Sequence, residues 1–168
     1  MRVLVTAASR HNATEDMAEV IADVLRDDLT AALGKVSVDV IPAEEVVTVD
    51  DYDAVVLGSA IYLGEWLKEA DDLAREHAEA LQERPVWLFS SGPVGDQPSM
   101  AEPDCIANLL AITGAREHQL FAGRLRQAVL DLGERAALRV VRASEGDYRD
   151  WTAIREWANR IADDLAEV

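Results

Sequence analysis

A buried strand that passes through a short polar loop into a helix constrains the fold of this chain more than any other stretch. Residues 3–5 (Val-Leu-Val) form a continuous apolar run, as expected of a strand covered on both faces. After the polar residues 9–14, apolar side chains recur at helical spacing, which predicts a helix over Thr14–Leu33. Such a strand–loop–helix unit is typical of parallel α/β sheets.

The loop of this unit has the chemistry of a phosphate-binding site. The first N–H groups of a helix have no internal acceptor, and the helix dipole favours an anion there. Ser9 and Thr14 add hydroxyl groups at both ends of the loop. These residues are also ordinary helix caps, and Asn12 and Glu15 have the spacing of a capping box. Neither the Walker nor the dinucleotide glycine pattern is present, so both interpretations stay open at this point.

The rest of the chain alternates between strands and helices. We predict strands over 36–41, 54–57, 86–89 and 118–121, and helices over 66–81, 104–113, 134–141 and from a cap at Asp150 onward. This alternation predicts a parallel sheet with helices on both faces. At 168 residues, the chain is expected to form one domain over 1–168.

Composition narrows the classes of partner and location. Asp and Glu number 32 against 16 Lys and Arg, for a net charge of −16, so nucleic acid is a poor partner and a basic protein a better one. No apolar run reaches the length of a membrane span, and no leader pattern is seen. Cys105 is the single cysteine, and no cluster of residues indicates a metal. We expect a cytoplasmic protein, free or peripheral at the membrane.

Three predicted strands end in loops of small or polar residues, namely Thr6–Thr14, Gly58–Trp66 and Ser90–Gly95. In a parallel sheet, ligands bind beyond the carboxyl ends of the strands. The first loop offers phosphate donors, and the second contains Tyr62 and Trp66, although Trp66 is equally suited to packing on the core. A phosphorylated planar ligand fits this combination, and FMN would occupy all three loops.

Five segments in order carry a resemblance to a known superfamily: VLVTAASRHNAT, YDAVVLGSAIYLGEW, PVWLFSSGPVG, LFAGRL and YRDWTAIREWA. With these segments the chain resembles the flavodoxin-like superfamily, whose phosphate loop has the pattern S/T-x-T-G-x-T. It looks most similar to the flavodoxin-type, menaquinone-dependent protoporphyrinogen oxidases and their actinobacterial and archaeal relatives.

The resemblance implies an α/β three-layer sandwich with a five-stranded parallel sheet in the order 2-1-3-4-5. It also implies non-covalently bound FMN that transfers electrons or hydride, with a redox partner protein or a quinone as partner. By position, three groups of residues would bind FMN. The phosphate would lie against Ser9, Arg10, His11, Asn12, Ala13 and Thr14, and the ring against Ala60, Ile61 and Tyr62 on one side and Ser91, Gly92, Pro93 and Val94 on another.

Two departures from the superfamily pattern bear on function. Asn12 stands where the phosphate loop normally has glycine, and His11 is unusual beside it; asparagine tolerates left-handed backbone angles better than most residues. The segment after Leu125 is shorter than in the oxidases, and it has no aromatic residue between Phe121 and Tyr148.

Three functions follow as hypotheses. The first is an FMN-binding redox protein, acting as an electron carrier or a small oxidoreductase. The second is a protoporphyrinogen IX oxidase that passes electrons to a quinone, in which five arginines would meet the propionates of the porphyrinogen substrate: Arg124, Arg126, Arg135, Arg139 and Arg142. The third is a flavodoxin fold without cofactor that acts as an interaction domain.

Overall fold

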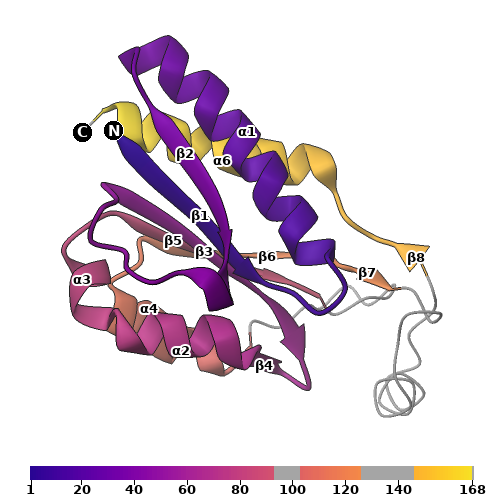
Figure 1. Cartoon of the computed structure of the whole chain (residues 1–168). Coiled ribbons are helices and arrows are strands. Elements are labelled where there is room, and N and C mark those ends of the chain that lie inside the picture. The colour runs from indigo at the N-terminus through magenta and orange to yellow at the C-terminus, as the bar shows by residue number, and fades with distance from the viewer. Residues whose placement is uncertain (93–102, 126–145, 168) are drawn as a thin grey trace.

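The fold is built on a parallel sheet, seen in a computed structural model that describes residues 1–92, 103–125 and 146–167. The sheet has the order β2-β1-β3-β5-β6, which is the predicted order 2-1-3-4-5 counted along the chain (Figure 1). Its strands are β1 (Arg2–Ala8), β2 (Ser37–Pro42), β3 (Ala54–Tyr62), β5 (Val86–Ser91) and β6 (Glu117–Phe121). The short strand β4 (Glu65–Trp66) turns back antiparallel to β3.

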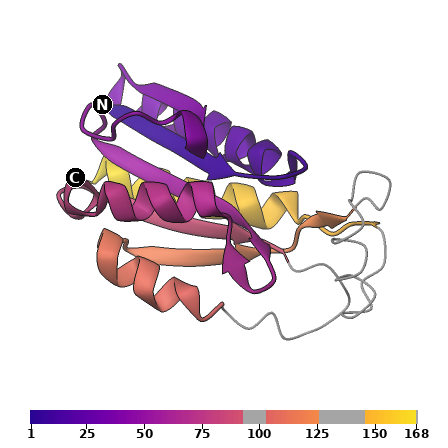
Figure 2. The same cartoon turned by 60° about the horizontal axis from the view of Figure 1, so that its bottom comes forward.

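Helices cover both faces of the sheet and complete the predicted three-layer sandwich (Figures 1 and 2). One face carries α1 (Ala13–Leu33) and α6 (Trp151–Ala166). The other face carries α2 (Lys68–Glu76), α3 (Ala78–Gln82) and α4 (Cys105–Thr113), with a 3-10 turn, η1, at Ala43–Glu45. The alternation of side chains along β1 divides the core, since Val3 and Val5 face α1 and α6 while Leu4 faces the other layer. The α/β prediction is confirmed.

The strands β3 and β5 are longer than predicted, because they continue through small residues for which the sequence predicts loops. Gly58 lies inside β3, where a Cβ atom would stand 2.2 Å from the ring of Phe89 on the neighbouring strand. That ring packs edge-on against Trp157 of α6, with centroids 6.0 Å apart. Glycine is therefore required here by the packing of an aromatic ring rather than by a turn.

The predicted helix over 66–81 is wrong at its start and in its continuity. Trp66 belongs to β4, where it pairs with Ile61, and Leu67 has an extended backbone, so the helix begins only at Lys68. The helix is also divided at His77 into α2 and α3. The predicted helix over 134–141 lies outside the described residues.

The helix ends follow the sequence signals more closely. Gly34 and Gly114 end α1 and α4 with positive φ angles. Asp150 caps α6 as predicted, because its Oδ1 accepts a hydrogen bond from the N–H of Ala153 at 3.0 Å. Among the described helices, none is long and apolar enough to cross a bilayer.

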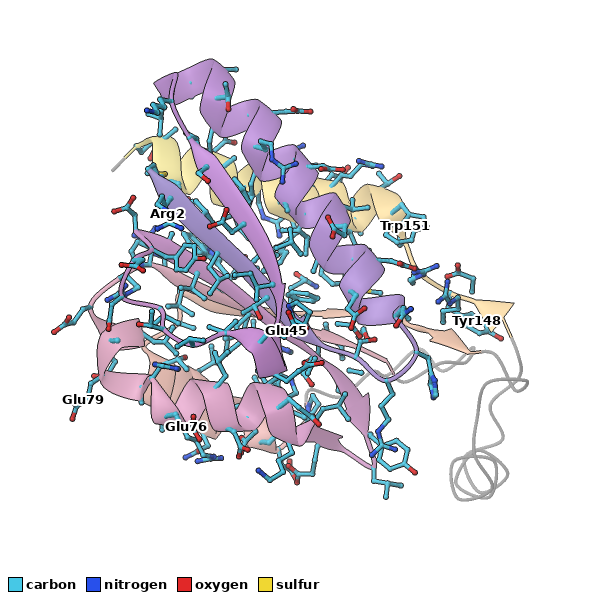
Figure 3. The ribbon with its side chains drawn as sticks, in the orientation of Figure 1. Arg2, Glu45, Glu76, Glu79, Tyr148 and Trp151 are labelled. Atoms are coloured by element: carbon cyan, nitrogen blue, oxygen red, sulfur yellow. The ribbon has the colours of Figure 1, made fainter. Side chains whose placement is uncertain are left out.

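A two-stranded antiparallel ribbon, made of β7 (Arg124–Leu125) and β8 (Gly146–Asp147), lies beyond the carboxyl end of β6 (Figure 1). The N–H of Tyr148 donates to the carbonyl of Gly123 at 3.1 Å and extends this pairing by one bond. Figure 3 shows Tyr148 and Trp151 on the segment that runs from the ribbon into α6. This segment brings late residues of the chain to the start of α1.

Candidate functional site

The predicted site residues that the structure describes gather at the carboxyl edge of the sheet. Residues 9–14, here called the phosphate loop, join β1 to α1, and residues 60–62, here called the ring wall, end β3. In the sheet, Ala8 pairs with Ser59 and Ala60 pairs with Ser91, so the three strand ends lie side by side. Pro93 and Val94 lie outside the described residues.

The phosphate loop turns through a left-handed residue at Asn12, whose φ is 61° and ψ is 2°. Glycine adopts this conformation without strain, and asparagine is among the few other residues that adopt it readily. The carbonyl of Asn12 accepts the first helical hydrogen bond, from the N–H of Asp16 at 3.0 Å. The Asn12 side chain makes no capping hydrogen bond in the described part of the chain, so the capping-box alternative is not realised.

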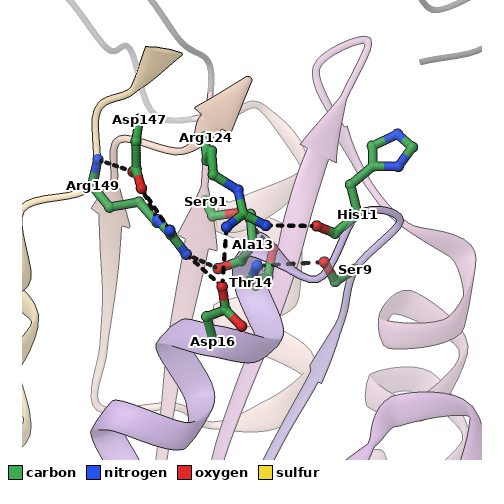
Figure 4. A network of polar contacts seen from close by, with 9 residues as sticks. All are labelled: Ser9, His11, Ala13, Thr14, Asp16, Ser91, Arg124, Asp147 and Arg149. Atoms are coloured by element: carbon green, nitrogen blue, oxygen red, sulfur yellow. Dashed lines mark hydrogen bonds and ion pairs between the residues drawn. The ribbon is translucent and has the colours of Figure 1, made fainter. Parts of the chain in front are cut away.

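Thr14 links the phosphate loop to the end of β5. Its side chain is fully buried, and its Oγ1 lies 2.6 Å from Oγ of Ser91 (Figure 4). The N–H of Thr14 donates to Oγ of Ser9 across the loop, at 3.4 Å. Next to Ser91, Gly92 has a φ of 105°, and its N–H donates to the carbonyl of Phe121 at 2.9 Å. The loop and two strand ends therefore form one hydrogen-bonded unit.

Two arginines hold the phosphate loop from the side of the ribbon (Figure 4). Arg124 donates from Nη2 to the carbonyl of His11 at 3.1 Å and from Nη1 to Asp16 at 3.4 Å. Arg149 donates from Nη1 to the same Asp16 at 2.9 Å and to the carbonyl of Ala13 at 3.4 Å. Their side chains are only 17% and 5% exposed, unlike ordinary surface arginines.

Sequence reasoning missed this arrangement. The sequence places Arg124 among the arginines expected to meet a substrate and does not mark Arg149. No local pattern identifies either role, because Arg149 reaches Asp16 across 133 positions of sequence. The other four arginines of that expected patch, at 126, 135, 139 and 142, lie outside the described residues.

Both positively and negatively charged side chains lie near the phosphate loop. A hydrogen bond from Arg149 holds the pKa of Asp147 below its ordinary value. Burial raises the pKa of Glu15 in the first turn of α1, and the nearby carboxylates of Glu44 and Asp16 add to this rise. The buried arginines thus offset part of the negative charge that the first turn brings to the loop.

The ring wall meets the phosphate loop through a stacked pair. The guanidinium of Arg10 lies 4.3 Å from the centre of the Tyr62 ring. Just beyond, Leu63 and Gly64 form a two-residue turn between β3 and β4, with φ angles of 51° and 81°. Leu63 is 76% exposed, which leaves an apolar side chain beside the ring wall.

Trp66 packs in the core next to the ring wall. It is buried, its Nε1 donates to Oγ of Ser90 at 2.7 Å, and that Oγ also lies 2.7 Å from Nε2 of His118. Of the two interpretations of Trp66, packing on the core is the one the structure supports. Within the three described ranges, no group of His, Cys, Asp and Glu side chains is arranged to hold a metal ion.

Comparison with known proteins supports the fold described above. Similar solved structures include a flavodoxin of Streptococcus pneumoniae TIGR4, with 20% identity, a TM-score of 0.60 and 99% of each chain covered. A flavodoxin from the domain Archaea is 16% identical with a TM-score of 0.61, and the match covers 98% of this chain and 99% of that one. Rubredoxin oxygen:oxidoreductase from the anaerobe Desulfovibrio gigas is 17% identical with a TM-score of 0.63, and the match covers 98% of this chain and 36% of that one. None of the curated proteins compared with the chain matches it. Residues 4–152 match the flavodoxin domain family, and the chain therefore belongs to that family.

Proposed function

We propose that this chain binds FMN non-covalently at the carboxyl edge of its sheet and exchanges electrons with other redox proteins. The observation that carries the proposal is the buried contact between Thr14 and Ser91, at 2.6 Å. It joins a helix N-terminus suited to a phosphate group to a strand end suited to a flat ring.

The residues at the phosphate end fit the group. Asn12 supplies the left-handed turn that glycine would otherwise provide, so the backbone of the loop does not require glycine at this position. Ser9 brings a hydroxyl group to the start of α1, and the buried hydroxyl of Thr14 ties the loop to Ser91. The buried guanidinium groups of Arg124 and Arg149 lie beside the loop and offset part of its negative charge.

The residues at the ring end have a different task. Ala60, Ile61 and Tyr62 would lie along one side of the ring, and Ser91 and Gly92, with Pro93 and Val94, along another. When bound, the flavin supplies electron transfer at its ring. The chain's own residues bind the phosphate, orient the ring and cover it with apolar side chains.

Partner choice follows from charge. The net charge of −16 includes exposed carboxylates such as Glu76 and Glu79 on the outer surface of α2 and α3 (Figure 3). Such a surface attracts basic proteins over a distance set by ionic strength. We therefore expect a redox partner with a basic docking face, and faster association at low salt.

The test is a flavin titration of the purified protein with two matched variants. Wild-type protein should retain FMN after desalting, with a visible absorption spectrum and FMN released on denaturation. Asn12→Asp places a carboxylate in the phosphate loop and should weaken FMN binding about tenfold or more, because a like charge would face the phosphate. Asn159→Asp adds the same charge on an exposed turn of α6 and should leave affinity unchanged.

A colourless protein that cannot be reloaded with FMN would overturn the proposal in favour of an interaction domain without cofactor.

Protoporphyrinogen oxidation is a narrower hypothesis on the same site. Of its five expected arginines, the described Arg124 is engaged with His11 and Asp16 rather than directed to a substrate. Turnover of reduced porphyrin by the FMN-loaded protein with a menaquinone analogue would support it.

A further inference from the structure

We infer that Arg124 is a positioning residue, which orients the peptide group between His11 and Asn12 so that the N–H of Asn12 faces the ligand, and that Arg149 holds Arg124 in place through their shared Asp16. The inference rests on the proposed function for the identity of that ligand. It concerns two side chains from the segment after β6, which lie outside the loop and which local sequence signals do not mark.

The first step concerns the peptide group between His11 and Asn12. A trans peptide is planar, and its C=O and N–H point in opposite directions. The carbonyl of His11 points toward Arg124, which donates to it at 3.1 Å, while the ring of His11 points elsewhere (Figure 4). The N–H of Asn12 must therefore point away from Arg124, toward the inner side of the loop.

This peptide group needs an external partner. The helical hydrogen bonds of α1 begin with the carbonyl of Asn12, which accepts from Asp16. The carbonyl of His11 lies one residue before that ladder, so the helix does not determine its direction. Asn12 is also left-handed and exposed, and its side chain makes no capping bond within the described chain. Arg124 supplies a hydrogen bond that fixes this carbonyl from outside the helix.

Arg149 contacts the chain two residues further along, at Ala13. It donates to the carbonyl of Ala13 at 3.4 Å, and by the same geometry the N–H of Thr14 points the opposite way. That N–H is in fact directed to Oγ of Ser9, across the loop. Because Ala13 is the first residue of α1, the helix already sets the direction of this peptide, and the N–H of Thr14 binds within the loop rather than facing the ligand.

Contacts with neighbouring side chains hold both arginines in place. Asp16 accepts from both, Asp147 accepts from Arg149, and the Arg149 guanidinium lies 4.5 Å from the Trp151 ring centre. Two cations and two carboxylates leave the group neutral, so its effect on an anion comes mainly from the oriented N–H of Asn12. The consequence is a preference for a flavin that carries a phosphate over one that does not.

The experiment compares FMN with riboflavin, which has the same ring but no phosphate. Dissociation constants for both are measured by fluorescence quenching for wild-type protein, Arg124→Gln and Arg149→Gln. We expect FMN affinity to fall about tenfold in each variant, with riboflavin affinity within about twofold of wild type. Arg124→Lys, which keeps the charge and one donor to His11, should recover part of the FMN affinity.

The control is Arg75→Gln on α2. Arg75 makes a comparable two-nitrogen pair with Asp71, far from the loop, and should change neither affinity. In flavin-free protein, amide hydrogen exchange at Thr14, whose N–H donates to Ser9 across the loop, should become several-fold faster in Arg124→Gln and stay unchanged in Arg75→Gln. This second measurement needs no flavin and also serves if the Arg149 variant fails to fold.

Equal losses of FMN and riboflavin affinity, or no change in either, would overturn the inference while leaving FMN binding intact. If wild-type protein binds no flavin, the proposed function fails, and the exchange rate at Thr14 alone decides whether Arg124 orients the loop. Unchanged exchange in Arg124→Gln would then reject the positioning role.

Discussion

The hydroxyl groups of Thr14 and Ser91 lie 2.6 Å apart in the interior, although 77 positions separate them in the sequence. Thr14 opens α1 and Ser91 closes β5, so this single contact sets the spacing between the phosphate loop and the end of a strand two places away in the sheet. Both residues were predicted to contact the cofactor, but no sequence pattern predicted that they contact each other.

Thr14→Val should lower the free energy of unfolding by about 1–3 kcal/mol. Valine keeps the shape of threonine but removes the hydroxyl, and Ser91, only 5% exposed, loses its partner. Urea unfolding followed by circular dichroism measures the change. The double variant with Ser91→Ala should lose about 1 kcal/mol less than the sum of the two single variants, since the two residues share one interaction. Strict additivity would show that the contact contributes nothing.

Gly58→Ala should destabilise the fold by about 1–3 kcal/mol, because the added methyl group would overlap the Phe89 ring. Thermal unfolding measures this loss. Phe89→Leu in the same protein removes the clash and should restore part of the stability lost by Gly58→Ala. If the combined variant is less stable than either single one, the overlap with the ring is not the cause.

Leu63→Asn should stabilise the protein by about 1 kcal/mol. Leu63 is left-handed at a φ of 51° in the turn between β3 and β4, a conformation that costs leucine more than asparagine. Leu63→Ala removes the exposed apolar side chain but keeps the strain, and should give no such gain. Chemical unfolding of the two variants side by side separates backbone strain from surface hydrophobicity, and an equal gain in both would exclude strain.

Asp147→Asn should lower the melting temperature at neutral pH, and its difference from wild type should shrink in acid. Arg149 lowers the pKa of Asp147 from its ordinary value of 3.8 in the folded state. A lowered carboxyl pKa adds stability above the unfolded-state pKa, and this stability is lost as the pH falls through the folded-state pKa. Melting curves between about pH 7 and pH 2 test this, with the exposed Asp27→Asn as control. A difference from wild type that does not change with pH would contradict the electrostatic origin.

The parts of the fold predicted from sequence are those set by local chemistry. The start of α1, its end at Gly34 and the cap at Asp150 each depend on a few adjacent residues. The carboxyl ends of β3 and β5 were misjudged, because Gly58 resembles a turn residue until its neighbour on the next strand is known. The same limit explains the arginines, since Arg124 meets His11 only after the chain has folded back across 113 positions.

The ties between the start of α1 and the segment before α6 also bear on the order of events during synthesis. A ribosome releases the phosphate loop early, but Arg149, which contacts Asp16, emerges 133 residues later. Contacts of such large sequence separation close late, because the loop-closure entropy between them is recovered only once the intervening chain is folded. The nascent chain therefore has its β1–α1 unit well before the late contacts to Asp16 can form, and the loop between β1 and α1 is expected to reach its final arrangement after translation rather than during it.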